Sequence, residues 1–224
     1  MNSAGNPTRV RPACELVIDG KTVAGDAGTY PVTNPLRPDE VVLDAPAASP
    51  AQLDAAVAAA RRAQPAWAGL SPEQRAGQLI AAARCDAEVT EDLARLLTRE
   101  HGKVLWEATF DIGTVAGMAA AFAPLVAQST VSRTVPIGTG RHTLVERVPH
   151  GVVGAIIPFN WPVSVLGNKV LPALLAGNAV VAKPPPTCPG AMLEVAALLA
   201  AGLPPGLLNV VNGPDVWLGQ AIVS

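Results

Sequence analysis

The chain has 224 residues, of which 50% are hydrophobic and 15% are charged, a composition that excludes a disordered chain and allows a sizeable core. Its net charge of −2 and its 4% of aromatic residues offer no basic or base-stacking surface, so we expect no nucleic-acid partner. The cysteines Cys14, Cys85 and Cys188 are odd in number and form no CxxC pair. We expect inert thiols and a reducing, cytoplasmic location.

Residues 1–13 are predicted to be a flexible tail without a signal peptide, because they are polar and contain no apolar run. We expect no stretch of uncharged apolar residues to reach the ~18 residues of a membrane span. Lys169 interrupts the best candidate for such a stretch. The sequence therefore predicts no association with a membrane.

Residues 14–130 are predicted to form strands followed by helices. The segment 14–23 reads as a strand pair around Asp19-Gly20, because Asp-Gly favours a hairpin turn. The residues 33–35, Thr-Asn-Pro, indicate another turn.

Two helix starts share one signature, a serine followed by proline at the first helical position and by glutamine three residues on. This capping-box pattern occurs at Ser49 and at Ser71. The first helix is expected to end at Gln64, because Pro65 cannot continue it. Two more helices are predicted at about 91–100 and 104–123.

Residues 131–149 read as two strands joined by a glycine turn at 138–140. Half of each strand is polar, so we expect this hairpin to rest on something else, such as another subunit. In residues 150–224 strands and helices alternate. The strands are predicted at 152–157, 179–182 and 207–211, and the helices at 162–176, 190–201 and after Gly213-Pro214.

Strands that are apolar on both faces and separated by helices predict a parallel sheet, in which ligands bind at the carboxyl ends of the strands. Asn160 follows the first strand and lies between two prolines. Its amide could donate a hydrogen bond to a developing oxyanion. The alternative is a turn asparagine that bonds its own backbone.

Lys183 directly follows the second strand, where it could contact a phosphate or a ribose hydroxyl; the alternative is a solvated strand end. Gly213 and Gly219 flank the start of the last helix, which suits a phosphate, although the chain has no GxGxxG fingerprint. The histidines have no metal-ligand spacing, so we expect surface positions for them and no metal site. They are His101, His142 and His150.

The segment 158–162, Pro-Phe-Asn-Trp-Pro, resembles the P-W-N-F-P motif of the aldehyde dehydrogenase superfamily. The resemblance continues in chain order through LPALLAGN, VVAKP, LPPG and LNVV, which begin at residues 171, 180, 203 and 208. Upstream, IDGK, NP and EHGK begin at residues 18, 34 and 100. Several ordered motifs from residue 14 to residue 224 make this similarity highly specific.

The resemblance implies an α/β fold like that of aldehyde dehydrogenases, with a Rossmann-like parallel sheet, flanking helices and an oligomerisation hairpin at 131–149. It implies NAD- or NADP-dependent oxidation of an aldehyde to an acid, in a homo-oligomer. A cysteine thiolate attacks the aldehyde, hydride passes to the nicotinamide, and a glutamate-activated water releases the product.

The resemblance also implies roles for individual residues. Asn160 would supply one oxyanion-hole donor, and Lys183 would contact the adenine ribose or its phosphate. The other residues implied to line the cofactor site are Ile157, Pro158, Phe159, Gly213 and Gly219.

Two features depart from the family pattern. Pro186 replaces a glutamate that often binds the ribose hydroxyls in the family, which leaves the choice between NAD and NADP open. None of the three cysteines matches the family's nucleophile, and the general-base glutamate has no counterpart in the sequence.

Residues 150–224 would then be the first three βα units of an incomplete dinucleotide-binding domain. We expect the chain to be the amino-terminal, cofactor-binding fragment of the enzyme and to be inactive alone. The alternative is a non-catalytic protein that binds a dinucleotide or joins an oligomer as a partner.

Overall fold

The structure is a computed structural model. It describes residues 14–84, 87–129, 131–214 and 216–224. The predicted tail at 1–13 and the side chain of Cys85 fall outside these ranges.

A five-stranded sheet lies at the centre of the fold, in the order β2-β1-β9-β8-β7. Its strands are β1 (Leu16–Ile18), β2 (Lys21–Val23), β7 (Val152–Ile156), β8 (Ala179–Lys183) and β9 (Leu208–Val210). The strands β7, β8 and β9 are parallel, as predicted. The hairpin at Asp19-Gly20 is confirmed as β1 and β2, and β1 extends the sheet by pairing antiparallel with β9.

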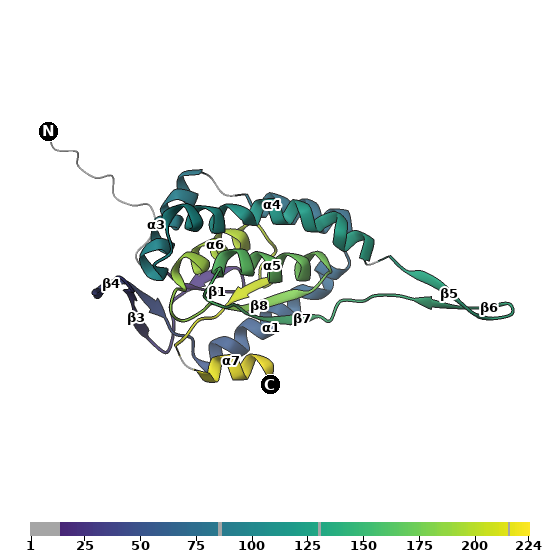
Figure 1. Cartoon of the computed structure of the whole chain (residues 1–224). Helices are drawn as coiled ribbons and strands as arrows, with labels where there is room; N and C mark the ends of the chain where they lie inside the picture. Colours follow the sequence, from purple (N-terminus) through teal and green to yellow (C-terminus); the bar gives the residue numbers. More distant parts are fainter. Residues whose placement is uncertain (1–13, 85–86, 130, 215) are drawn as a thin grey trace.

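Helices cover both faces of this sheet (Figure 1). One face carries α1 (Pro50–Ala68) and α7 (Val216–Val223), and the other carries α5 (Pro162–Leu175) and α6 (Gly190–Ala201). A further layer, formed by α2 (Pro72–Ala82), α3 (Ala87–His101) and α4 (Leu105–Ser129), packs on α5 and α6.

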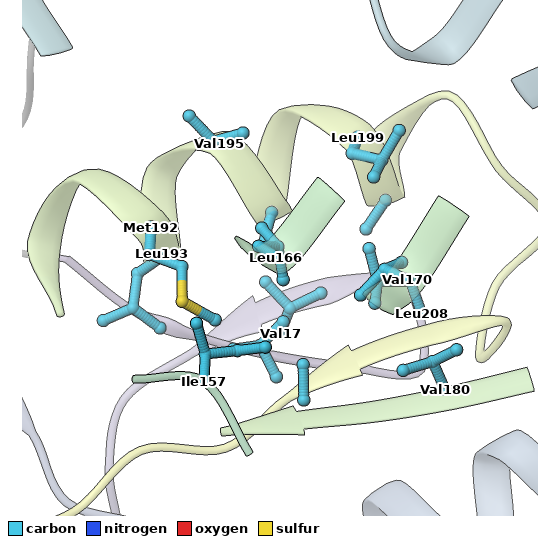
Figure 2. Packing of buried hydrophobic residues seen from close by; sticks show 14 of the residues in the cluster. Val17, Ile157, Leu166, Val170, Val180, Met192, Leu193, Val195, Leu199 and Leu208 are labelled. Atoms are coloured by element: carbon cyan, nitrogen blue, oxygen red, sulfur yellow. The ribbon is translucent and has the colours of Figure 1, made fainter. Parts of the chain in front are cut away.

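The main core lies between the sheet and α5 and α6. Figure 2 shows Val180 and Leu208 of the strands facing Leu166 of α5 and Leu193 of α6. All four side chains are at most 1% exposed. Burial of each such side chain contributes roughly 1.5–3 kcal/mol, so this interface holds the strands and their connecting helices in a fixed arrangement.

The predicted end of α1 at Gln64 is wrong, because the helix continues through Pro65 to Ala68. A proline removes one helical hydrogen bond and crowds the preceding turn. Here the last turn of α1 is anchored from outside. The buried indole N–H of Trp67 donates to the carbonyl oxygen of Leu174 at 2.7 Å, and this tertiary bond offsets the local penalty.

The helix α4 also departs from the predictions. It continues past residue 123 through Pro124, because Phe122 and Val126 on either side of the proline pack against the core. The expectation about apolar length is wrong as well. Within the described ranges, α4 is the one helix long and apolar enough to cross a membrane by length and composition. Only 22% of its apolar window is buried, although α4 packs against α2, α3 and α5.

Two further hairpins stand outside the central sheet. Only the turn of the first is predicted by the sequence; its strands, β3 (Thr29–Asn34) and β4 (Arg37–Pro46), contain prolines and many exposed side chains, which obscure the alternation. The second is formed by β5 (Arg133–Gly138) and β6 (Arg141–Val145), where a hairpin is predicted. It projects from the body of the molecule (Figure 1), and nearly all its side chains are exposed.

Replacing Trp67 tests whether its tertiary bond holds the end of α1. Trp67→Phe keeps an aromatic ring but leaves the Leu174 carbonyl without its donor and opens a small cavity, so we expect a loss of about 2 kcal/mol in the free energy of unfolding. The matched control is Trp106→Phe on α4, where the side chain is 70% exposed and the change should stay within about 0.5 kcal/mol. Urea unfolding measures both, and equal losses would contradict the assignment.

Candidate functional site

The parallel ladder brings three of the predicted site segments to one edge of the sheet. Ile156 is in register with Lys183, and the backbone N–H of Ile157 donates to the Lys183 carbonyl oxygen at 3.0 Å. The N–H of Val211 donates to the Ala182 carbonyl oxygen, also at 3.0 Å. The segments that follow these strands, which contain Asn160, Pro186 and Gly213, therefore start side by side.

Asn160 lies in an irregular loop between β7 and α5, with exposed Pro158 and Phe159 before it. The Asn160 side chain is exposed and makes no hydrogen bond with any described residue. A turn asparagine bonded to its own backbone is therefore not what the structure contains. The amide N–H groups remain available to a ligand at the carboxyl end of β7.

Lys183 is the last residue of β8, and it is 7% exposed, so it is not a solvated strand end. Its Nζ donates to the carbonyl oxygen of Pro184 at 3.2 Å. Burial lowers the pKa of Lys183. An ammonium has three donors, and a neighbouring carbonyl engages one of them, so a phosphate or a hydroxyl group would complete its hydrogen bonding.

Two of the predicted cofactor contacts are glycines: Gly213 follows β9, and Gly219 lies within α7. Gly213 is buried, and the preceding Asn212 holds the turn by donating from Nδ2 to the Pro46 carbonyl oxygen at 2.8 Å. A Cβ added to Gly219, in the second turn of α7, would meet nothing within 4 Å. A lysine ammonium, a glycine turn and a helix start are donors suited to a dinucleotide.

A pocket of about 490 Å³ lies beside this edge. Phe159, Pro186 and Pro214 line one part of it, and Tyr30 and His101 line another. The other predicted cofactor contacts lie outside its lining: Ile157, Pro158, Lys183, Gly213 and Gly219. The structure thus divides the predicted residues between the pocket wall and the neighbouring strand ends, loops and α7.

His101 departs from the expected surface position. It is partly buried at the end of α3, and neither ring nitrogen has a hydrogen-bond partner among the described residues. Burial and the nearby charge of Lys103 lower the pKa of His101, which favours the neutral ring. Its ring centroid lies 6.5 Å from that of Phe159.

Two buried thiols lie near the edge without the properties of a nucleophile. Burial raises the pKa of Cys188 to about 12 and raises that of Cys14 as well. Glu100 adds to both shifts; its own pKa is raised by burial to about 7, and it accepts backbone N–H groups of Gly190 and Ala191. Protonated thiols are weak nucleophiles, so both fit the predicted inert role. The described residues contain no cluster suited to a metal ion.

Two buried charges beneath the Asn160 loop are missing from the predicted site. Lys103 and Asp111 form an ion pair at 3.0 Å, with side chains 4% and 0% exposed. The Lys103 Nζ lies 3.8 Å from the ring centroid of Trp161, the residue after Asn160. Lys103 belongs to the EHGK segment, but a short motif does not show which distant side chain it meets.

Comparison with known proteins agrees with the family resemblance of the sequence motifs. Residues 22–224 match the aldehyde dehydrogenase family. An N-succinylglutamate 5-semialdehyde dehydrogenase of Chromobacterium violaceum is 40% identical over 199 residues, which are 88% of this chain and 40% of the relative. A 3,6-anhydro-alpha-L-galactose dehydrogenase of Streptomyces coelicolor is 40% identical over 200 residues, with the same two coverages. The chain thus spans about 40% of the length of these relatives.

Several solved structures have the same fold as this chain. An NADP-dependent enzyme of E. coli superposes with a TM-score of 0.85 at 33% identity, covering 93% of this chain and 44% of that one. PnpE in complex with nicotinamide adenine dinucleotide gives a TM-score of 0.84 at 34% identity, covering 93% and 43%. The α/β fold with its parallel sheet is therefore confirmed, and this chain belongs to the aldehyde dehydrogenase family.

Proposed function

We propose that this chain forms the dinucleotide-binding part of an enzyme that oxidises an aldehyde to a carboxylic acid with NAD or NADP. The observation that carries the proposal is the convergence of Asn160, Lys183 and Gly213 at the carboxyl edge of β7, β8 and β9. Ligands bind at this edge in open α/β sheets. Relatives of the same fold are described as NADP-dependent or as complexed with NAD, which supports the choice of cofactor.

Each predicted residue has a role suited to its place. Lys183 would bind a ribose hydroxyl or a phosphate, and the backbone at Gly213 and Gly219 would approach the adenine and pyrophosphate. Ile157, Pro158 and Phe159 would line the cleft, where the bound nicotinamide supplies the hydride acceptor.

Asn160 would donate its amide N–H to the aldehyde oxygen as negative charge develops there. An amide held in place before the reaction stabilises that charge without having to reorient. Cys14 and Cys188 are poorly suited to be the nucleophile, because both are buried and burial raises the pKa of each thiol.

Pro186 bears on the choice between the two cofactors. It lines the pocket and carries no charge, so no carboxylate at this position repels the 2′-phosphate of NADP. A carboxylate would also hold the ribose hydroxyls of NAD, and that contact is missing too. Both cofactors are therefore compatible with this position.

A second candidate is a non-catalytic protein that binds a dinucleotide or joins an oligomer as a partner. The projecting hairpin favours this reading, since Ile137 and Leu144 are 62% and 60% exposed on it. The same hairpin would serve a homo-oligomer of the enzyme. Free, buried Cys14 and Cys188 support the proposed cytoplasmic location, which fractionation of the source cells would test.

Lys183→Met tests the proposed cofactor site. The variant removes a charge-assisted contact, so we expect it to weaken binding of NAD and NADP about 10-fold or more, measured by calorimetry. Lys21→Met, at an exposed position on β2, is the matched control and should bind as the unaltered chain does. Equal affinities for all three proteins, or no binding by the unaltered chain, would contradict the proposal.

The hairpin predicts the association state. Light scattering should give the chain at least twice the monomer mass, and Ile137→Lys with Leu144→Lys should return it to monomers, because charges on an apolar contact are costly to bury. Both side chains are exposed, so circular dichroism should not change. A monomeric unaltered chain would rule out association through the hairpin. Co-purification with a longer relative but no aldehyde-dependent reduction of NAD or NADP in that complex would favour the second candidate.

A further inference from the structure

We propose that the buried ion pair between Lys103 and Asp111 positions Asn160, by fixing the first turn of α5 and the indole of Trp161. The inference rests on the proposed role of Asn160 as a hydrogen-bond donor to the aldehyde oxygen. Lys103 and Asp111 are positioning residues, because they act through Trp161 and Ser164 and do not touch the substrate.

The first anchor is a helix cap supplied by another helix. Trp161 is the N-cap residue of α5, and its side chain accepts no hydrogen bond from the free N–H groups of the first turn. Asp111 of α4 takes this role, since its Oδ1 accepts the backbone N–H of Ser164 at 2.6 Å. A carboxylate is favoured at a helix N-terminus by the free N–H groups and by the helix dipole.

The hydroxyl of Ser164 tightens the same junction. It lies 3.0 Å from the Thr114 hydroxyl and donates to the Asp111 carbonyl oxygen at 3.3 Å. Both the backbone and the side chain of Ser164 are therefore tied to α4. Asn160 precedes the N-cap directly, so a fixed first turn limits where the Asn160 backbone can lie.

The second anchor is the ammonium of Lys103. Its Nζ lies 3.0 Å from Asp111 Oδ2, and neither side chain is more than 4% exposed. An unpaired carboxylate at such a place would be strongly destabilising, so Lys103 makes the Asp111 cap possible. The pair also fixes the position of the Lys103 ammonium, because this buried charge must stay close to the Asp111 carboxylate that neutralises it.

The Lys103 ammonium holds Trp161 in turn. It lies 3.8 Å from the centroid of the Trp161 ring, where the negative face of an indole attracts a cation, more strongly when water is excluded. Phe110 of α4 meets the same indole edge-on, with ring centroids 6.1 Å apart and an interplanar angle of 83°. The residue bonded to Asn160 is thus held through its side chain as well as through its helix.

The test must separate positioning from stability. The double variant Lys103→Met with Asp111→Leu replaces the ion pair by apolar side chains of similar size, an exchange that buried pairs often tolerate without loss of stability. It removes both the cap and the cation from Trp161. The matched control is Arg75→Met at the other end of α5, where the buried Arg75 Nε donates to the Leu175 carbonyl oxygen at 2.8 Å.

The readouts are the melting temperature and the backbone ¹⁵N order parameter of Asn160 in the full, deuterated chain. We expect an order parameter of about 0.85 in the unaltered chain and below about 0.6 in the double variant, with a melting temperature lowered by only a few degrees. Arg75→Met should lower the melting temperature and leave Asn160 rigid. Lys103→Arg should also keep Asn160 rigid, because a guanidinium can pair with a carboxylate and stack on an indole.

A folded double variant with a rigid Asn160 would overturn the inference, and so would equal loosening of Asn160 by Arg75→Met. If the double variant does not fold, Trp161→Leu serves in its place, since it removes the cation contact and leaves the ion pair intact. Because the Asp111 cap remains in Trp161→Leu, rigidity of Asn160 there would contradict the part of the inference that assigns positioning to the indole. Dinucleotide titration of the unaltered chain reports separately on the proposed function, so failure of one does not disguise failure of the other.

Discussion

Parallel hydrogen bonding between β7, β8 and β9 places the carboxyl ends of three strands at one edge of the sheet, and each candidate cofactor contact depends on that register. The bond from Ile157 to Lys183 aligns the end of β7 with the end of β8. A shift of one residue would turn the Lys183 side chain to the opposite face. Such a shift is opposed by the core that these strands share with α5 and α6, seen in Figure 2.

The helices that connect the three strands share an unusual feature at their first turns. Neither α5 nor α6 has a side-chain cap from its own N-cap residue, Trp161 or Pro189. Buried carboxylates from the outer helix layer bond these turns instead. Asp111 of α4 accepts a backbone N–H of α5, and Glu100 of α3 accepts two backbone N–H groups of α6. The outer layer therefore contributes to the geometry of the ligand edge, although it contains none of the predicted contact residues.

Much of this fold could be predicted from local patterns. Ser49 and Ser71 begin helices with the expected capping boxes, and the apolar runs after residue 150 became the parallel strands. These signals act within a few residues of one another, which is why they can be read from the sequence.

The errors arise where a distant contact overrides a local signal. Pro65 does not end α1, because the Trp67 indole N–H donates a hydrogen bond to the Leu174 carbonyl oxygen. The full length of α4 is not predicted, because Pro124 is a local signal for a helix end, although the helix continues through it to Ser129. The sequence predicts site positions at the strand ends, but it does not predict the roles of Lys103 and Asp111. Their importance comes from contacts with Trp161 and Ser164, which are 58 and 53 residues away along the chain, and no local pattern predicts such contacts.

The most direct test of the account is a titration of the ¹⁵N-labelled chain with NAD and with NADP, followed through its backbone amide resonances. Binding at the carboxyl edge predicts that the largest shifts occur at residues of that edge, namely Ile157, Phe159, Lys183, Gly213 and Gly219. The amide resonances of the hairpin formed by β5 and β6 should not shift. Shifts confined to other parts of the molecule, or none at saturating cofactor, would contradict the claim that this edge is a dinucleotide site.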